Sequence, residues 1–145
     1  MKRTASAALA ALLVVSTAAA SFQDEWERQV RLQLTAAGQA FAAEGYTLTH
    51  RIFTGSLENE DNATVTIPLD AGREYHIMGV CDTDCSDLDL QFTDPAGNEV
   101  STDVEDDDTP VVSVRTTQAG TYTVEVGMAA CSDEPCRFGL GAFAR

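Results

Sequence analysis

The chain has 145 residues, with 23 acidic and nine basic side chains and a formal net charge of −14. Such a negative surface repels phosphate backbones and anionic lipids, so we expect no nucleic-acid partner, whereas cations and basic surfaces are attracted. The length suits one domain with its own apolar core and is too short for two.

The N-terminus predicts a signal peptide over residues 1–20. Lys2 and Arg3 form a positive head, the stretch from Leu9 to Val15 is apolar, and Ala18 to Ala20 offer small residues to a peptidase. No segment approaches the roughly 20 apolar residues that cross a bilayer, so we expect no stable membrane insertion. The mature protein is expected to begin at Ser21 and to be exported, to the periplasm or out of the cell.

Residues 21–45 predict one amphipathic helix. Apolar side chains recur at steps of three and four, the period of one helix face: Phe22, Trp26, Val30, Leu34, Ala37 and Phe41. Gly45 after Glu44 is a typical helix stop. We expect the apolar face to pack on the rest of the domain, and the alternative is a helix that docks to a partner protein.

After Gly45 the period changes to two, which is typical of strands in an all-β sandwich or barrel. No further helix is available for parallel crossovers, so we expect antiparallel sheets in residues 46–145. Turn residues such as Ala71-Gly72, Asp94 to Asn98 and Ala119-Gly120 separate the runs. Eight runs are readable: 46–54, 63–69, 74–80, 88–93, 99–102, 111–116, 121–128 and 137–143.

Four cysteines form two close pairs with C-x3-C and C-x4-C spacing. In an exported chain such pairs favour disulfides over a zinc site, which stays the alternative. Four cysteines allow three pairings. Proximity along the chain favours Cys81–Cys85 and Cys131–Cys136, although a cross-link between the distant pairs would restrict the unfolded chain more.

Four carboxylates follow one strand and begin the next: Asp82, Asp84, Asp87 and Asp89. Calcium prefers several oxygen ligands from flexible loops, so this segment is a candidate calcium site, although it lacks the glycine and glutamate of an EF-hand. Strand alternation points Asp87 and Asp89 outward together. A second acidic run, from Asp103 to Asp108, can approach the same edge. The alternative is an acidic surface covered by water.

Nothing in the sequence predicts an enzyme. His50 and His76 are the only histidines, and neither G-x-S-x-G nor H-E-x-x-H is present. Seven aromatic residues are expected in the core rather than on a sugar-stacking surface: Tyr46, Phe53, Tyr75, Phe92, Tyr122, Phe138 and Phe143.

Several short motifs together resemble the bacterial pre-peptidase C-terminal domain. They are Gly55-Ser56-Leu57, Leu69 to Tyr75, Asp87-Leu88-Asp89-Leu90, Asp94-Pro95-Ala96-Gly97, the acidic stretch ending at Thr109-Pro110, and Gly120 to Val124. The resemblance implies a jelly-roll-like β-sandwich of about eight strands that is a non-catalytic module of secreted peptidases. Some members bind calcium or assist substrate binding.

The expected function is therefore that of an exported binding or stabilising module, with calcium as candidate cofactor and an unknown protein or polysaccharide as partner. Two alternatives remain open. One is a metal-independent jelly roll that recognises carbohydrate or protein, and the other is a partner or inhibitor of a separate secreted peptidase that acts through the N-terminal helix.

Overall fold

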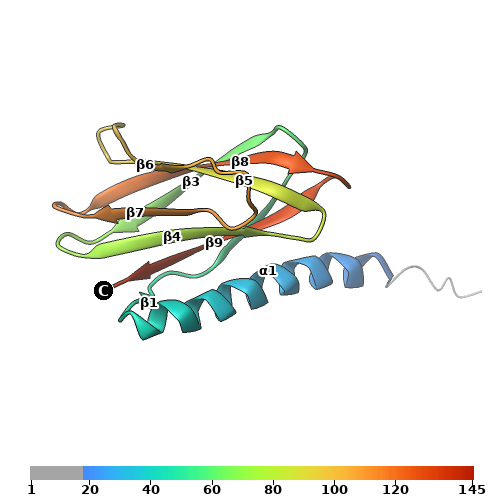
Figure 1. Cartoon of the computed structure of the whole chain (residues 1–145), viewed down its shortest axis with the longest axis horizontal. Helices are drawn as coiled ribbons and strands as arrows, with labels where there is room; N and C mark the ends of the chain where they lie inside the picture. Colours follow the sequence, from blue (N-terminus) through green and yellow to red (C-terminus); the bar gives the residue numbers. More distant parts are fainter. Residues whose placement is uncertain (1–17) are drawn as a thin grey trace, which may run out of the picture.

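The computed structural model describes residues 18–145, with side chains from Glu25 onward (Figure 1). Residues 1–17 of the predicted signal peptide lie outside the described part. One helix, α1 (Ala18–Ala43), precedes nine strands. The strands are β1 (Thr47–Leu48), β2 (Phe53–Leu57), β3 (Asn62–Leu69), β4 (Glu74–Cys81), β5 (Cys85–Thr93), β6 (Glu99–Asp103), β7 (Val111–Arg115), β8 (Gly120–Cys131) and β9 (Cys136–Ala144).

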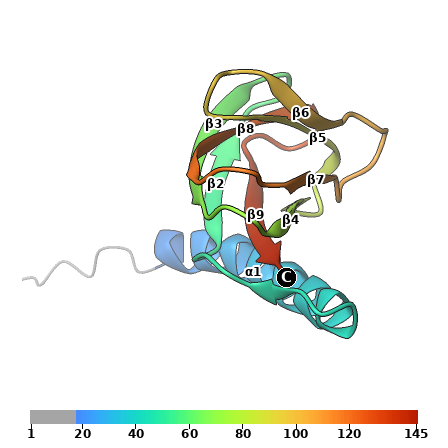
Figure 2. The same ribbon diagram turned by 90° about the vertical axis from the view of Figure 1, so that its left-hand side faces the viewer.

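The strands form two antiparallel sheets packed face to face, as Figure 2 shows from the end of the sandwich. One sheet has five strands in the order β1-β9-β4-β7, with β2 also paired to β9. The other has the order β3-β8-β5-β6. The prediction of an antiparallel β-sandwich preceded by one helix is confirmed.

The predicted alternation places the core where the two sheets meet. Val65 and Ile67 of β3 lie opposite Val124 and Tyr122 of β8, and all four side chains are buried. Six of the seven aromatic residues expected inside are buried as well, and the exception is Phe53, which is 43% exposed. Burial of these large side chains contributes strongly to the driving force for folding.

The predicted run 46–54 is interrupted, which raises the number of strands from eight to nine. Leu48 pairs with Phe143 and Phe53 pairs with Leu140, so four residues of one strand lie opposite two of the other. Within this bulge Thr49 bonds to the carbonyl of Ala142 through both its N–H and its hydroxyl. These bonds keep the chain beside β9 while it leaves the regular ladder.

Helix α1 lies along the outer face of the five-stranded sheet (Figure 1). Val30 and Leu34 are at most 1% exposed, and they pack over Gly139 and Gly141 of β9. The helix ends at Ala43, and the chain turns away at Gly45, whose φ of 87° suits glycine. Most of the predicted apolar face is therefore used within the domain.

Candidate functional site

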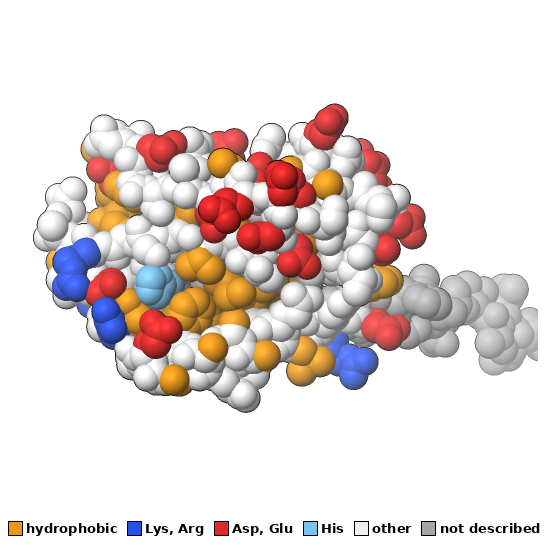
Figure 3. Space-filling view, viewed as in Figure 1, with side chains coloured by type: hydrophobic (Ala, Val, Ile, Leu, Met, Phe, Trp, Pro, Cys, Tyr) orange, Lys and Arg blue, Asp and Glu red, His pale blue; other side chains and the backbone are white. Residues whose placement is uncertain are grey.

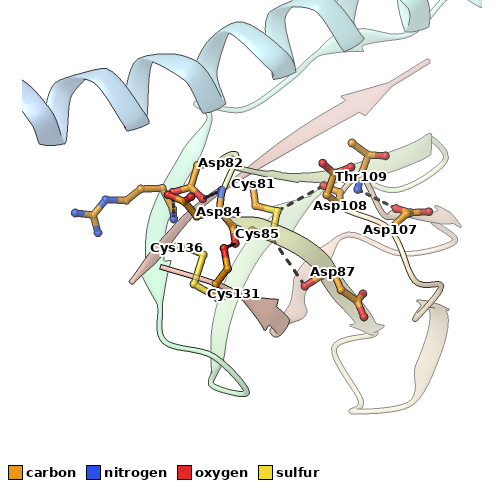
Figure 4. Close-up of a disulfide and its surroundings, with 12 residues drawn as sticks. Cys81, Asp82, Asp84, Cys85, Asp87, Asp107, Asp108, Thr109, Cys131 and Cys136 are labelled. Carbon is orange, nitrogen blue, oxygen red and sulfur yellow. Dashed lines mark hydrogen bonds between the residues drawn. A yellow bond between two sulfur atoms is a disulfide. The ribbon is translucent and has the colours of Figure 1, made fainter. Parts of the chain in front are cut away.

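Two disulfides close neighbouring loops at one end of the sandwich. Cys81 is bonded to Cys85 and Cys131 to Cys136, the pairings favoured by proximity along the chain. Cys85 also lies opposite Cys131 in the β5–β8 ladder, so the two bridges are adjacent (Figure 4). Both bridges fit an oxidising compartment, and no thiol remains free to bind zinc.

Asp82 holds the loop that the first disulfide closes. Its side chain is buried, one carboxylate oxygen accepts the N–H of Arg137 at 2.7 Å, and the other accepts the N–H of Asp84 at 3.3 Å. The N–H of Asp82 in turn donates to the carbonyl of Arg137 at 3.0 Å. Burial raises the pKa of Asp82, and the backbone hydrogen bonds oppose that rise. The carboxylate thus extends the β4–β9 ladder.

Asp84 lies on the same side of the Cys81–Cys85 bridge as Asp82 (Figure 4). Its carbonyl accepts the N–H and the hydroxyl of Ser132, which ties the two disulfide loops together. Its half-buried side chain lines a cavity of about 210 Å³ that Trp26 and Arg137 also border.

Asp87 lies on the other side of the Cys81–Cys85 bridge (Figure 4). Asp87 and Asp89 share the outer face of the four-stranded sheet, since the residues between and beside them, Leu88 and Leu90, are buried. Asp87 Oδ1 is buried and has no hydrogen-bond partner in the described part of the chain. Burial raises the pKa of Asp87, and the negative charges of Asp106 and Asp107 raise it further. Burial also raises the pKa of Asp89, with smaller effects from Asp87, Asp103 and Asp106.

The connection between β6 and β7, which carries the second acidic run, is hydrogen-bonded to β5. The N–H of Leu88 donates to the carbonyl of Asp107 at 2.9 Å, and the carboxylate of Asp107 accepts the N–H of Thr109 at 2.8 Å. The carboxylate of Asp103 accepts the N–H of Val111 at 2.8 Å. Figure 3 shows acidic side chains gathered on one side of the sandwich, above an apolar strip beside α1.

The structure therefore divides the four predicted calcium ligands into two pairs. Asp82 and Asp84 stabilise the disulfide loops, whereas Asp87 and Asp89 face the acidic connection between β6 and β7. Over residues 18–145, no three acidic, histidine or cysteine side chains are already gathered as metal ligands.

The two histidines have structural neighbours that the sequence did not reveal. His76 Nδ1 shares a hydrogen bond with the hydroxyl of Ser113 on β7, and its ring stacks on Phe41 and packs against Tyr46. Within the described chain no carboxylate is bonded to the His76 ring, so the pair lacks the acid of a serine-hydrolase triad.

His50 bonds through both ring nitrogens, to Thr49 and to the carbonyl of Pro68.

We expect the protein to be more stable at about pH 5 than at about pH 7. The folded state raises the pKa of Asp82, Asp87 and Asp89, so it retains protons that the unfolded chain has lost above about pH 4. Stability then falls as pH rises through that window. Glu74 and Asp94 have lowered pKa values, through hydrogen bonds from Tyr46 and Asn98 respectively, and their contribution is lost only at lower pH.

Thermal melting at the two pH values checks this prediction. Asp87→Asn combined with Asp89→Asn should reduce the difference between the midpoints, because both amides stay neutral throughout. A wild-type midpoint that is higher at about pH 7 would contradict it.

Comparison with known proteins identifies the sandwich. A family model described as the bacterial pre-peptidase C-terminal domain matches residues 52–127, more than half of the chain. The matched segment includes Asp82, Asp84, Asp87 and Asp89 and leaves out α1 and β9. No curated protein matches the chain significantly. Within the described residues, helix α1 is not apolar enough over a sufficient length to cross a membrane.

Proposed function

Because the chain belongs to the bacterial pre-peptidase C-terminal domain family, we propose that it is an exported, non-catalytic binding or stabilising module. Members of this family are non-catalytic domains appended to secreted peptidases. The two disulfides support export, since they persist in oxidising compartments. The negative charge of the chain supports a cationic ligand.

We propose calcium as that ligand, bound at the edge formed by Asp87, Asp89 and the connection between β6 and β7. The observation that carries this proposal is the buried Asp87 Oδ1, which lacks a hydrogen-bond partner within residues 18–145 and lies near the charges of Asp106 and Asp107. An unpartnered carboxylate oxygen beside like charges is costly, and a divalent cation relieves both costs. Asp87, Asp89 and Asp106 would hold the ion, and calcium would draw their carboxylates together.

Thermal melting of the exported protein with and without calcium tests the proposal. Calcium at a hundred times its Kd should stabilise the folded state by about 2.7 kcal/mol, which raises the midpoint by several degrees. Asp87→Asn combined with Asp89→Asn should abolish the rise. Asp84→Asn is the matched control, because Asp84 lies across the disulfide bridge and should leave the rise intact.

Two results would overturn the calcium site. One is an unchanged midpoint at millimolar calcium, and the other is an equal response in the double variant and the wild type. Neither result bears on membership of the family, so a metal-independent module would remain.

A further inference from the structure

The sandwich is closed along one side and open along the other. On the closed side, N–H groups of β7 donate to side chains of β6, from Ser113 to Ser101 and from Val111 to Asp103. On the open side, β2 and β3 are the edge strands of the two sheets, and within the described chain they do not pair with each other. A cavity of about 320 Å³ lies there.

The walls of this cavity are apolar and come from both sheets. Val65 and Ile67 of β3 face Leu140 and Ala142 of β9, and these core side chains are 2–8% exposed. Phe53, the exposed aromatic residue of β2, completes the lining. The cavity therefore opens the hydrophobic core to solvent between the two edges.

The polar groups of His50 and Pro68 beside the cavity already have hydrogen-bond partners. The carbonyl of Pro68 accepts Nε2–H of His50 at 2.9 Å, and the other ring nitrogen of His50 bonds the Thr49 hydroxyl at 2.8 Å. Pro68 itself has no N–H to offer an added strand. A peptide or sugar inserted here would lose the hydrogen bonds that it makes to water, whereas an alkyl chain loses none.

Arg51 provides a charge at the mouth of the cavity. It is exposed, lines the cavity, and forms no ion pair among the described residues. The only other ionisable group in the lining is His50, and no carboxylate lines the cavity although the chain has 23. The mouth therefore offers a ligand an unpaired positive charge and no carboxylate.

We propose that this cavity binds an aliphatic carboxylate, with its alkyl chain between the two sheets and its carboxylate beside the guanidinium of Arg51. Ligand pockets range from about 300 to 1,000 Å³, so a cavity of about 320 Å³ suits a small amphiphile of medium chain length. The guanidinium can pair with a carboxylate through two parallel hydrogen bonds. The site is independent of the calcium edge, since it shares no residue with it.

Calorimetric titration of the full exported protein with decanoate, below the concentration at which decanoate forms micelles, tests the proposal. We expect saturable binding to one site. Arg51→Gln should weaken it about tenfold, the loss of one charge-assisted contact. Arg28→Gln, which removes an exposed arginine of α1 outside the cavity, is the matched control and should bind as the wild type does. Decanol should bind more weakly than decanoate.

A second variant tests the cavity itself. Val65→Phe fills the space with a larger apolar side chain and should block binding, provided that circular dichroism shows an intact fold. The absence of saturable decanoate binding to the wild type would overturn the proposal. Equal weakening by Arg28→Gln would also overturn it, because general charge attraction would then explain the binding. Equal affinity for decanoate and for the cation decyltrimethylammonium would overturn the proposal as well.

Discussion

Gly139→Ala is expected to loosen α1 from the five-stranded sheet. A Cβ atom at this position would lie 2.3 Å from Cγ1 of Val30, whereas carbon atoms in contact need about 3.5 Å or more. Val30 is fully buried, and the carbonyl of Phe53 also lies 3.3 Å from the added atom. The helix must therefore shift, at a cost of about 1–3 kcal/mol in the free energy of unfolding.

Trp26 reports this shift directly, because it is the single tryptophan of the chain and lies half-buried on α1. Its fluorescence in native Gly139→Ala should move toward that of exposed tryptophan, and urea unfolding should give the loss of stability. Combining Val30→Ala with Gly139→Ala should restore part of the stability and part of the native Trp26 fluorescence, since Val30→Ala removes the clashing methyl groups.

Gly127→Ala provides the matched control. It makes the same change in β8, in the sheet that α1 does not cover, so native Trp26 fluorescence should stay as in the wild type. If Gly139→Ala leaves both stability and fluorescence unchanged, α1 is not packed as the structure describes.

Much of this fold follows from local patterns in the sequence. Alternation along β3 and β8 indicated which side chains enter the core, and steps of three and four along α1 indicated Val30 and Leu34 as packing residues. Proximity favoured the two disulfides. These features depend on residues close together in the chain, which is why one sequence sufficed.

The candidate site depends instead on strand register and on the path of a connection. Alternation along β5 predicted that Asp87 and Asp89 share a face, but the approach of Asp106 and Asp107 depends on the path of the connection between β6 and β7, which alternation does not fix. His76 and Ser113 are 37 residues apart and meet only because β4 pairs with β7. The structure adds that the Asp82 carboxylate accepts two backbone N–H groups, and which of the four carboxylates bind calcium stays a prediction.

Asp82→Ala is expected to destabilise the protein by about 2–3 kcal/mol, the upper range for hydrogen bonds to charged groups. The substitution leaves the N–H of Arg137 without its acceptor, beside the last rungs of the β4–β9 ladder. An unpaired N–H that is shielded from water costs more than the net gain of one hydrogen bond. Urea unfolding of the oxidised protein measures the loss, and Asp84→Ala serves as the control at a half-buried neighbour.

Asp82→Asn separates the role of the oxygen atom from that of the charge. The amide oxygen can still accept the N–H of Arg137, and the burial that raises the pKa of Asp82 no longer opposes folding at neutral pH, so this variant should be more stable than Asp82→Ala. Because Asp82→Asn should remain folded, it also tests the division of the carboxylates. The rise in melting midpoint with calcium should persist in Asp82→Asn. Loss of that rise would show that Asp82 is a calcium ligand.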